Sequence, residues 1–315
     1  MIHTIENEYL KISVAELGAT LTKFIDKRSN TDIVLGYEDE DSYRQYAGNN
    51  MGISCGRNCN RIGNARFTLN GQEYQLTVND NMNQLHGGGI NGFGFKTWKL
   101  EEKSDNELVF SYLSKDGEEG FPGNLDARVS FRLEGDSLIY TFSGTSDKDT
   151  IFNMTNHSYF NLGDESILDE ELMITTDTYS PNDEYCLAKP VTEIVNGTYY
   201  DFREYRKLGD SLPNLDTAID NNYVWEKMED KLMASLRNDK LVLNIYSDLP
   251  DMHLYTSYYL EGGIGKYGKR YDRYKGCCLE CQYYPNAINY EGYLKPILRK
   301  GETMSHYMRM EVKER

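Results

Sequence analysis

The sequence predicts an all-β fold, built as one large antiparallel β domain in the form of a sandwich or a barrel. Three observations support this prediction. Apolar and polar residues alternate with a period of two in many short segments, which is the pattern of half-buried strands. Turn residues separate these segments about every 8–12 residues, as in sandwiches and barrels. The turn signals continue over residues 1–315 without a break in composition, so we expect a single domain.

Five segments carry the alternation most clearly, and we expect strands at residues 10–14, 67–76, 108–112, 129–142 and 241–245. Asn70-Gly71 divides the second segment, and Asn-Gly between alternating runs is the strongest short hairpin signal. Glu134-Gly-Asp136 divides the fourth segment in the same way. Helical spacing is weak and confined to residues 39–46 and 226–236, where we expect short helices.

The composition excludes several functions. The net charge of −16 disfavours nucleic acid and anionic membranes as partners, because both require a basic patch. No apolar run approaches the roughly 20 residues that span a bilayer, and the first residues do not resemble a signal peptide. Six cysteines, two of them adjacent at Cys277-Cys278, suit reduced thiols better than a disulfide framework. We therefore expect a cytoplasmic protein, and the sequence leaves open whether it is a monomer or a homodimer.

Two patterns resemble binding motifs but lack the context that such motifs need. Gly87-x-Gly89-x-x-Gly92 matches a dinucleotide fingerprint in form, yet that fingerprint lies between a strand and a helix. Residues 93–98 read as a strand, so we reject a nucleotide site. Cys55 and Cys59, with Cys278 and Cys281, have an acceptable spacing for zinc, but neither pair has the glycine and basic turn residues of a knuckle. Small buried cysteines are the more common case, and we expect no metal.

The segment Asn153-Met-Thr-Asn-His-Ser-Tyr-Phe-Asn-Leu162 is the most informative part of the chain. A strand that serves only packing would alternate, whereas this one surrounds His157 with asparagine and hydroxyl side chains. Buried polar groups need partners, so the segment suits a polar ligand or a shared hydrogen-bond network. His157 adds a proton that can move near neutral pH. These features suggest an acid–base site for a sugar.

Glu280 is a second candidate for acid–base chemistry. In a strand, Glu280 and Gln282 share a face opposite Leu279 and Cys281. Burial among such neighbours would raise the pKa of Glu280 and suit it to act as a base. A structural salt bridge to an arginine is an equal alternative.

Three further residues are weaker candidates, and each has a structural explanation. His86 precedes three glycines that allow positive φ, and it is either a residue at the rim of a site or an ordinary turn histidine. Arg61 is either directed at a ligand or one of a surface pair with Arg57. Asp220 lies in Asp-Asn-Asn, which is ordinary loop chemistry.

Seven blocks of sequence, in order and over nearly the whole length, resemble the aldose 1-epimerase family, also called galactose mutarotases. The blocks are Gly56-Arg-Asn-Cys-Asn-Arg-Ile62 (similar to the family's GRxANRI), Phe67-x-Leu-Asn-Gly-x-x-Tyr-x-Leu76, Asn83-x-Leu-His-Gly-Gly88, Asp116-Gly-Glu-Glu-Gly-Phe-Pro-Gly-Asn-Leu125, Thr155-Asn-His-Ser-Tyr-Phe-Asn-Leu162, Ile219-Asp-Asn-Asn-Tyr223 and Cys278-Leu-Glu-Cys-Gln282. Any one block is suggestive, and together they are highly specific.

The resemblance implies a β-supersandwich that binds a sugar in an open cleft of one sheet. It implies an isomerase that interconverts the α and β anomers of a free hexose such as D-galactose or D-glucose. Glu280 would be the general base and His157 the general acid, and we expect their ionised and protonated forms to stabilise each other. The positions that hold the sugar match Asn60, Arg61, His86, Asp220 and His253. No redox step occurs, so no cofactor is implied.

The chain departs from the family pattern at three places. Asn221 stands where the family usually has histidine, and His253 stands where it has a glutamine that contacts sugar. Cys59 and Cys281 replace small or hydroxyl residues. These changes leave the acid and the base in place but bear on sugar preference, and the extra histidine could alter the pH optimum.

Two other functions stay open for this sequence. One is a catalytically silent sugar-binding module on the same fold. The other is a glycoside hydrolase with Glu280 and Asp220 as paired carboxylates, which the resemblance strongly disfavours. A hexose 6-phosphate is disfavoured as substrate because Arg57 and Arg61 are too few to hold a phosphate.

Overall fold

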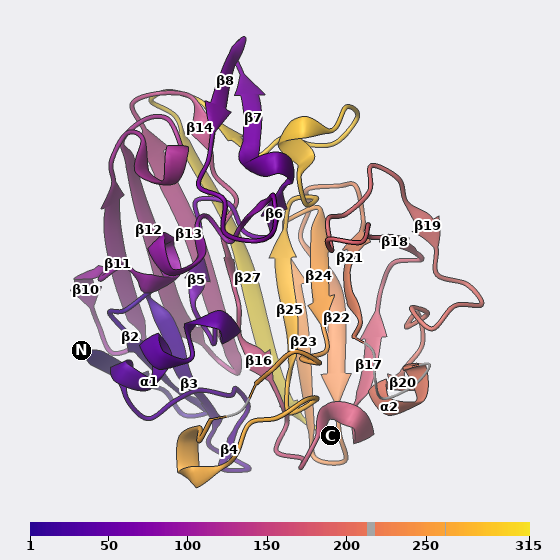
Figure 1. Cartoon of the computed structure of the whole chain (residues 1–315). Helices are drawn as coiled ribbons and strands as arrows, with labels where there is room; N and C mark the ends of the chain where they lie inside the picture. Colours follow the sequence, from indigo (N-terminus) through magenta and orange to yellow (C-terminus); the bar gives the residue numbers. More distant parts are fainter. Residues whose placement is uncertain (213–217, 262) are drawn as a thin grey trace.

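The computed structural model describes residues 1–212, 218–261 and 263–315, and it confirms the predicted antiparallel β-sandwich. Its largest sheet has nine strands (Figure 1). In spatial order they are β10 (Lys99–Lys103), β11 (Glu107–Ser114), β12 (Leu125–Glu134), β13 (Ser137–Ser146), β27 (Thr303–Glu314), β23 (Leu241–Ser247), β22 (Lys231–Arg237), β17 (Glu171–Ile174) and β20 (Arg206–Lys207). β27, the last strand of the chain, therefore lies between strands from residues 99–146 and strands from residues 171–247.

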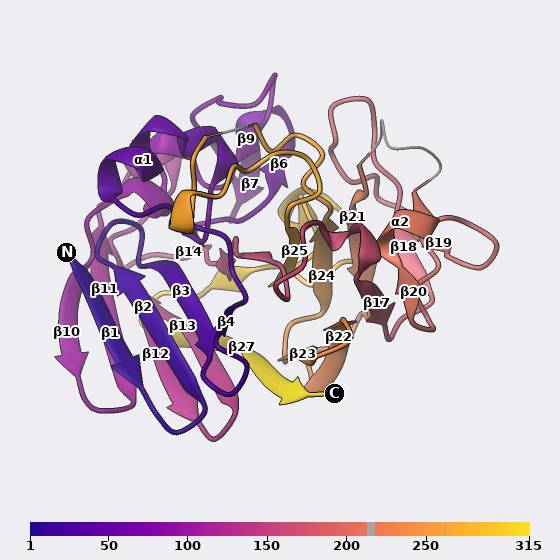
Figure 2. The same cartoon turned by 90° about the horizontal axis from the view of Figure 1, so that it is seen from below.

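Two smaller sheets pack on the nine-stranded sheet. One has four strands, β1 (Ile2–Glu6), β2 (Leu10–Ala15), β3 (Thr20–Asp26) and β4 (Thr31–Asp32). The other has six strands, in the order β16 (Tyr159–Phe160), β25 (Cys277–Gln282), β24 (Asp251–Tyr255), β21 (Asp220–Val224), β18 (Thr178–Ser180) and β19 (Glu193–Ile194). Figure 2 shows β1 to β3 lying over β11 to β13, and Figure 1 shows β25, β24 and β21 in front of β27, β23 and β22. Apolar side chains from all three sheets form one continuous core.

Four two-stranded pairs connect and cover the large sheets. They are β5 (Ser54–Cys55) with β15 (Thr155–Asn156), β6 (Arg61–Ile62) with β9 (Gln84–Leu85), β7 (Arg66–Leu69) with β8 (Gln72–Gln75), and β14 (Thr150–Ile151) with β26 (Ile297–Leu298). The β7–β8 hairpin turns at Asn70 and Gly71, which both have positive φ, as the Asn-Gly signal predicts. The predicted strands at 10–14, 108–112, 129–142 and 241–245 are confirmed as parts of β2, β11, β12 with β13, and β23.

The two predicted helices had different outcomes. Residues 39–46 contain helix α1 (Glu40–Gln45), whose first turn is capped by the Asp39 side chain. The prediction of a helix at 226–236 is wrong, because β22 occupies residues 231–237. A register shift between Leu232 and Ala234 breaks the period of two in β22, so its apolar side chains imitate helical spacing.

Helices contribute little to the structure. α1 and the four-residue α2 (Leu208–Ser211) are short, and the other helical segments are single 3-10 turns. Over the parts of the chain that the structure describes, no helix combines the length and the apolar character that crossing a membrane requires.

Candidate active site

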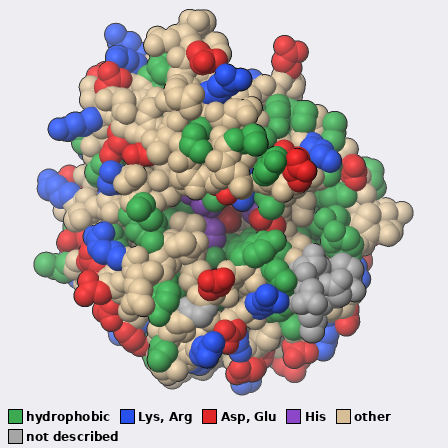
Figure 3. Space-filling view, in the orientation of Figure 1, with side chains coloured by type: hydrophobic (Ala, Val, Ile, Leu, Met, Phe, Trp, Pro, Cys, Tyr) green, Lys and Arg blue, Asp and Glu red, His purple; other side chains and the backbone are tan. Residues whose placement is uncertain are grey.

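A cleft of about 210 Å³ brings together every residue that the sequence nominated for the site. Its lining includes Asn60, Arg61, His86, His157, Asp220, His253 and Glu280, together with Tyr159, Tyr255 and Tyr259. Figure 3 shows histidine side chains at the bottom of a hollow in this face, with acidic side chains beside them. The residues come from β6, β16, β21, β24, β25 and the loops beside them, including those that follow β9 and β15, so only the folded chain assembles the site.

The six-stranded sheet provides the floor of the cleft. β25 pairs with β24 so that Glu280 is opposite His253, and His253 is in turn opposite Asn222 of β21. Asp220 lies two residues before Asn222 and therefore on the same face of the sheet. Leu279 and Cys281 point into the apolar core while Glu280 lines the cleft. This confirms the predicted division of β25 into two faces.

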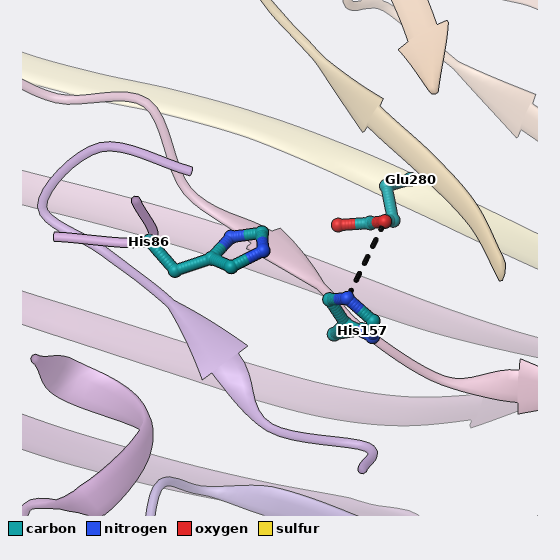
Figure 4. A group of neighbouring side chains, drawn as sticks. All are labelled: His86, His157 and Glu280. Carbon is teal, nitrogen blue, oxygen red and sulfur yellow. Dashed lines mark ion pairs between the residues drawn. The ribbon is translucent and has the colours of Figure 1, made fainter. Parts of the chain in front are cut away.

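Glu280 and His157 form the central pair of the site. Glu280 Oε1 lies 3.7 Å from His157 Nε2, and their side chains are 2% and 7% exposed (Figure 4). Glu280 Oε2 is buried without a hydrogen-bond partner among the described residues. His157 Nδ1 lies 3.5 Å from the thiol of Cys278, which is on the same face of β25 as Glu280.

Burial acts in opposite directions on the two members of this pair. It raises the pKa of Glu280 well above its ordinary 4.5, and it lowers the pKa of His157 from 6.5 to about 4. Burial of each group therefore favours a protonated carboxyl and a neutral imidazole, whereas the sequence led us to expect a resting ion pair. The two arrangements hold the same number of protons and differ only in which residue carries the shared one.

His86 is held in one tautomeric form by the backbone of Asn60, which lies beside it just outside the β6–β9 pair. The backbone N–H of Asn60 donates to His86 Nδ1 at 3.2 Å, and the N–H of His86 donates to the Asn60 carbonyl. Burial lowers the pKa of His86 well below 6.5, so the ring is neutral at neutral pH. Its proton must then lie on Nε2, because Nδ1 accepts. His86 thus offers an N–H donor next to His157, whose ring centroid is 5.2 Å away.

This tautomer makes the site a poor fit for a metal ion. Potential ligand atoms of His86, His157 and Glu280 lie within 4.8 Å of one another. A histidine that binds a metal normally donates its other N–H to an acceptor, whereas His86 Nδ1 faces a donor. The chemistry of the three groups suits hydrogen bonds and proton transfer instead. The four cysteines considered for zinc are also buried, which raises the pKa of each thiol and disfavours the thiolate that zinc requires.

Asp220, His253 and Arg61 also line the cleft. His253 Nε2 lies 2.6 Å from Asp220 Oδ1. Burial opposes ionisation of Asp220, but the hydrogen bond from His253 and the positive charges nearby lower its pKa overall. Arg61 Nε donates to Asp80 at 2.7 Å, and its side chain is 13% exposed, so Arg61 is a half-buried, ion-paired residue rather than part of a surface pair. Sequence reasoning missed Asp80, because nothing in its local sequence shows that it faces Arg61.

Arg57 has a structural role that its position in the sequence conceals. It is 1% exposed and donates to the side chain and carbonyl of Ser114 and to the carbonyls of Pro122, Lys115 and Gly123. The alternative of a surface arginine is therefore wrong for Arg57 as well. Its guanidinium holds the loop after β11 against the segment that carries Asn60 and Arg61.

The asparagines around His157 form a shared network that fixes the backbone. Asn156 donates to the carbonyl of Gly52 at 2.9 Å, Asn161 donates to the carbonyl of Lys275 at 2.7 Å, and Asn153 accepts from the N–H of Tyr283 at 3.1 Å. The sequence predicted that this polar segment contacts a polar ligand or forms a shared hydrogen-bond network. The asparagines form such a network, and His157 and Tyr159 line the cleft. The segment positions its histidine by anchoring both sides of it.

The fold and the site together define a structural class. It is a β-sandwich that holds a buried carboxyl–imidazole pair in an open polar cleft. A family model described as aldose 1-epimerase matches residues 1–311. Galactose mutarotase of Rattus norvegicus is 35% identical, covering 96% of this chain and 91% of its own length. Aldose 1-epimerase of Escherichia coli (strain K12) is 32% identical, covering 95% and 91%.

Solved structures agree with these sequence relatives. An aldose epimerase homologue from C. elegans superimposes with a TM-score of 0.93 at 26% identity, covering 100% of this chain and 99% of its own. A galactose 1-epimerase from Lactobacillus acidophilus NCFM superimposes with a TM-score of 0.86 at 27% identity, covering 99% and 93%. The chain belongs to the aldose 1-epimerase family.

Proposed function

We propose that the protein is a mutarotase that interconverts the α and β anomers of a free hexose such as D-galactose or D-glucose. The observation that carries this proposal is the Glu280–His157 pair, 3.7 Å apart in the floor of the cleft. The cleft volume of about 210 Å³ is below the range of roughly 300–1,000 Å³ typical of sites for drug-sized ligands, which suits one monosaccharide. The names of the sequence relatives support the same reaction.

The reaction needs one acid and one base on the two oxygens of the anomeric carbon. Ionised Glu280 would take the proton of the anomeric hydroxyl while protonated His157 gives a proton to the ring oxygen. The ring opens to the aldehyde, the C1–C2 bond rotates, and the reverse transfers close the other anomer. Moving the shared proton from Glu280 to His157 prepares the pair for this step without any exchange with solvent. No electron is transferred, so the step itself asks for no redox cofactor.

The remaining residues of the cleft would hold the sugar. His86 would donate from Nε2, Asp220 would accept from hydroxyl groups, and Arg61 would donate from the part of its guanidinium that Asp80 does not occupy. Asn60 and His253 complete this set. Each polar contact with a hydroxyl fixes the ring relative to the catalytic pair, and such positioning makes the proton transfers efficient.

Polarimetry of freshly dissolved α-D-galactose and α-D-glucose tests the proposal. We expect the native protein to accelerate the decay to equilibrium, and Glu280→Gln to slow the catalysed rate by about 10²–10⁴-fold, the usual contribution of a positioned base. Glu165→Gln, at an exposed glutamate, is the matched control and should retain the native rate. A native protein that only follows the spontaneous rate, yet binds sugar in calorimetry, would be a silent binding module. Release of nitrophenol from a nitrophenyl galactoside would favour a glycoside hydrolase.

We further propose that residues 1–315 act as one domain in a reducing compartment such as the cytoplasm, as a monomer or a homodimer. All six cysteines are free thiols, and β27 links the two parts of the largest sheet. Light scattering on the purified protein would measure the oligomeric state.

A further inference from the structure

The thiol of Cys278 contacts the imidazole of His157 at its second ring nitrogen. Nε2 of His157 faces Glu280 Oε1 at 3.7 Å, and Nδ1 lies 3.5 Å from Cys278 Sγ. Cys278 is fully buried, is opposite Tyr159 and Tyr255 on the neighbouring strands, and packs in the same apolar cluster as these tyrosines. Cys278 is not among the residues that line the cleft, so it can act on the reaction only through His157.

The proton of Glu280 determines which tautomer of His157 the reaction needs. Burial raises the pKa of Glu280, so its carboxyl favours the protonated form. Oε2 is buried without a hydrogen-bond partner among the described residues, whereas Oε1 faces Nε2, so only a proton on Oε1 is directed at a base. To receive that proton, Nε2 must be bare. The proton of the neutral ring then lies on Nδ1, toward the sulfur.

A buried thiol suits this contact with Nδ1. Burial raises the pKa of Cys278 well above its ordinary value, so the sulfur keeps its own proton and carries no charge. Sulfur is a weak acceptor, and its lone pairs can accept from Nδ1 both in the neutral ring and in the imidazolium. A carboxylate in the same place would stabilise the imidazolium and hold the shared proton on His157. The thiol orients the ring without deciding which member of the pair keeps that proton.

We propose that Cys278 is a positioning residue whose sulfur accepts a hydrogen bond from Nδ1 of His157 and thereby keeps Nε2 free to receive the proton of Glu280. This inference rests on the proposed function, because it concerns the acid of that reaction. Without the sulfur, a proton on Nδ1 would lose its partner inside the protein, which costs free energy. The ring would then favour the other tautomer, in which Nε2 already carries a proton and cannot accept the one from Glu280.

Cys278→Val and Cys278→Thr form a matched pair of variants. Their side chains differ only in a methyl against a hydroxyl group, so the cost of enlarging this buried residue is common to both. The hydroxyl can accept from Nδ1 and the methyl cannot. The backbone carbonyl of His157 also favours a proton on the ring, but it is the same in both variants. If these side chains do not fit, Cys278→Ser and Cys278→Ala repeat the comparison with smaller groups.

Polarimetry of α-D-galactose compares the rates of the two variants. We expect kcat of Cys278→Val to be about 10-fold below that of Cys278→Thr, the effect of one lost hydrogen bond. KM should be the same in both, because Cys278 does not line the cleft. Cys277→Val is the control, since Cys277 is equally buried and packs in the main core on the opposite face of β25. It should leave kcat unchanged.

Nitrogen-15 NMR of the imidazole ring measures the tautomer directly and needs no sugar, because protonated and bare ring nitrogens have different chemical shifts. Comparison with His157→Gln assigns the signals of His157. At about pH 7 we expect a protonated Nδ1 and a bare Nε2 in the native protein and in Cys278→Thr, and the reverse in most molecules of Cys278→Val.

Three results would overturn the inference. They are a native His157 with its proton on Nε2, the same tautomer in Cys278→Val and Cys278→Thr, and equal kcat values in these two variants. The first of them needs no variant. A native protein that does not accelerate mutarotation would contradict the proposed function instead, and the NMR comparison would still decide whether Cys278 sets the tautomer, so the two failures are distinct.

Discussion

Nε2 of His157 and Oε1 of Glu280 lie 3.7 Å apart. Burial raises the pKa of Glu280 and lowers the pKa of His157, so the carboxyl has the higher pKa of the two. In an unperturbed pair the glutamate base would have a pKa of 4.5 and the histidine acid a pKa of 6.5. Such a pair would be most active at pH values between these two. Here the carboxyl has the raised value and the imidazole the lowered one. The pair holds its single shared proton over the whole interval from about 4, the pKa of His157, up to the raised pKa of Glu280.

The first prediction concerns the pH dependence of the rate. Activity should fall as pH drops toward 4, where His157 takes up a second proton, and it should fall in alkali as the shared proton is lost from Glu280. Between these limits it should stay high. Polarimetry at saturating sugar, corrected for the spontaneous rate, measures this profile. Activity that already declines above about pH 6.5 would indicate a histidine of ordinary acidity.

The second prediction concerns Gly87, beside His86. A Cβ at Gly87 would lie 1.9 Å from the carbonyl oxygen of Gly56, and the residue has a φ of +70°. Gly87→Ala should displace His86 and lower kcat/KM by about 10²-fold, the effect of a misplacement of about 1 Å. Gly71→Ala is the matched control, because Gly71 has a φ of +77° but open space around it. It should cost about 1 kcal/mol of stability and leave kcat/KM unchanged.

The third prediction concerns the buried Lys266, remote from the cleft. Its Nζ contacts Asp32 Oδ2 at 2.6 Å and donates to the carbonyls of Thr22 and Val34 at 2.6 and 2.9 Å. Lys266→Met should lower the free energy of unfolding by about 3–5 kcal/mol, because it leaves a buried carboxylate without its partner. Urea denaturation measures this change. The exposed neighbour provides the control, and Lys269→Met should change stability by less than about 0.5 kcal/mol.

The fourth prediction concerns stability in acid. His306 is buried on β27 with Nε2 3.2 Å from the carbonyl of Met154, and burial lowers its pKa from 6.5 to about 4. The unfolded chain therefore binds more protons than the folded chain between these values, so stability present above 6.5 is lost as pH falls toward 4. At about pH 5 this one residue should account for roughly 2 kcal/mol.

His306→Gln keeps a donor for the Met154 carbonyl but cannot take up a proton. The difference in unfolding free energy between about pH 7 and pH 5 should therefore be smaller in the variant by roughly 2 kcal/mol. Comparing differences removes any constant cost of the substitution itself. An unchanged difference would show that other groups, such as His86 and His157, dominate the acid sensitivity.

The sequence was informative where local pattern and structure coincide. Period-two alternation identified β2, β11, β12, β13 and β23, and Asn70-Gly71 identified a hairpin, because strand faces and tight turns depend on neighbouring residues. The helix expected at 226–236 was wrong because a bulge in β22 imitates helical spacing. A bulge depends on the partner strands, and residues 226–236 contain no information about them.

The candidate site, like the fold, could be predicted from the sequence only in part. The resemblance to a family nominated residues that lie around one cleft, but it said nothing about their protonation. The neutral form favoured by Glu280 and His157 follows from burial by distant segments, and the tautomer of His86 follows from the backbone of Asn60. Arg57 and Arg61 also look alike in sequence, and only long-range contacts with Ser114 and Asp80 separate their roles.

β27 lies between β13 and β23 in the largest sheet, yet it follows both of them in the chain. Until residues 303–314 are available, β13 and β23 are unprotected edges that offer free N–H and C=O groups to any extended chain. During synthesis on the ribosome, such edges favour association with neighbouring chains over correct folding. Removing β27 should therefore yield aggregates rather than a smaller soluble protein, and the yield of native protein should depend on how quickly this strand is inserted.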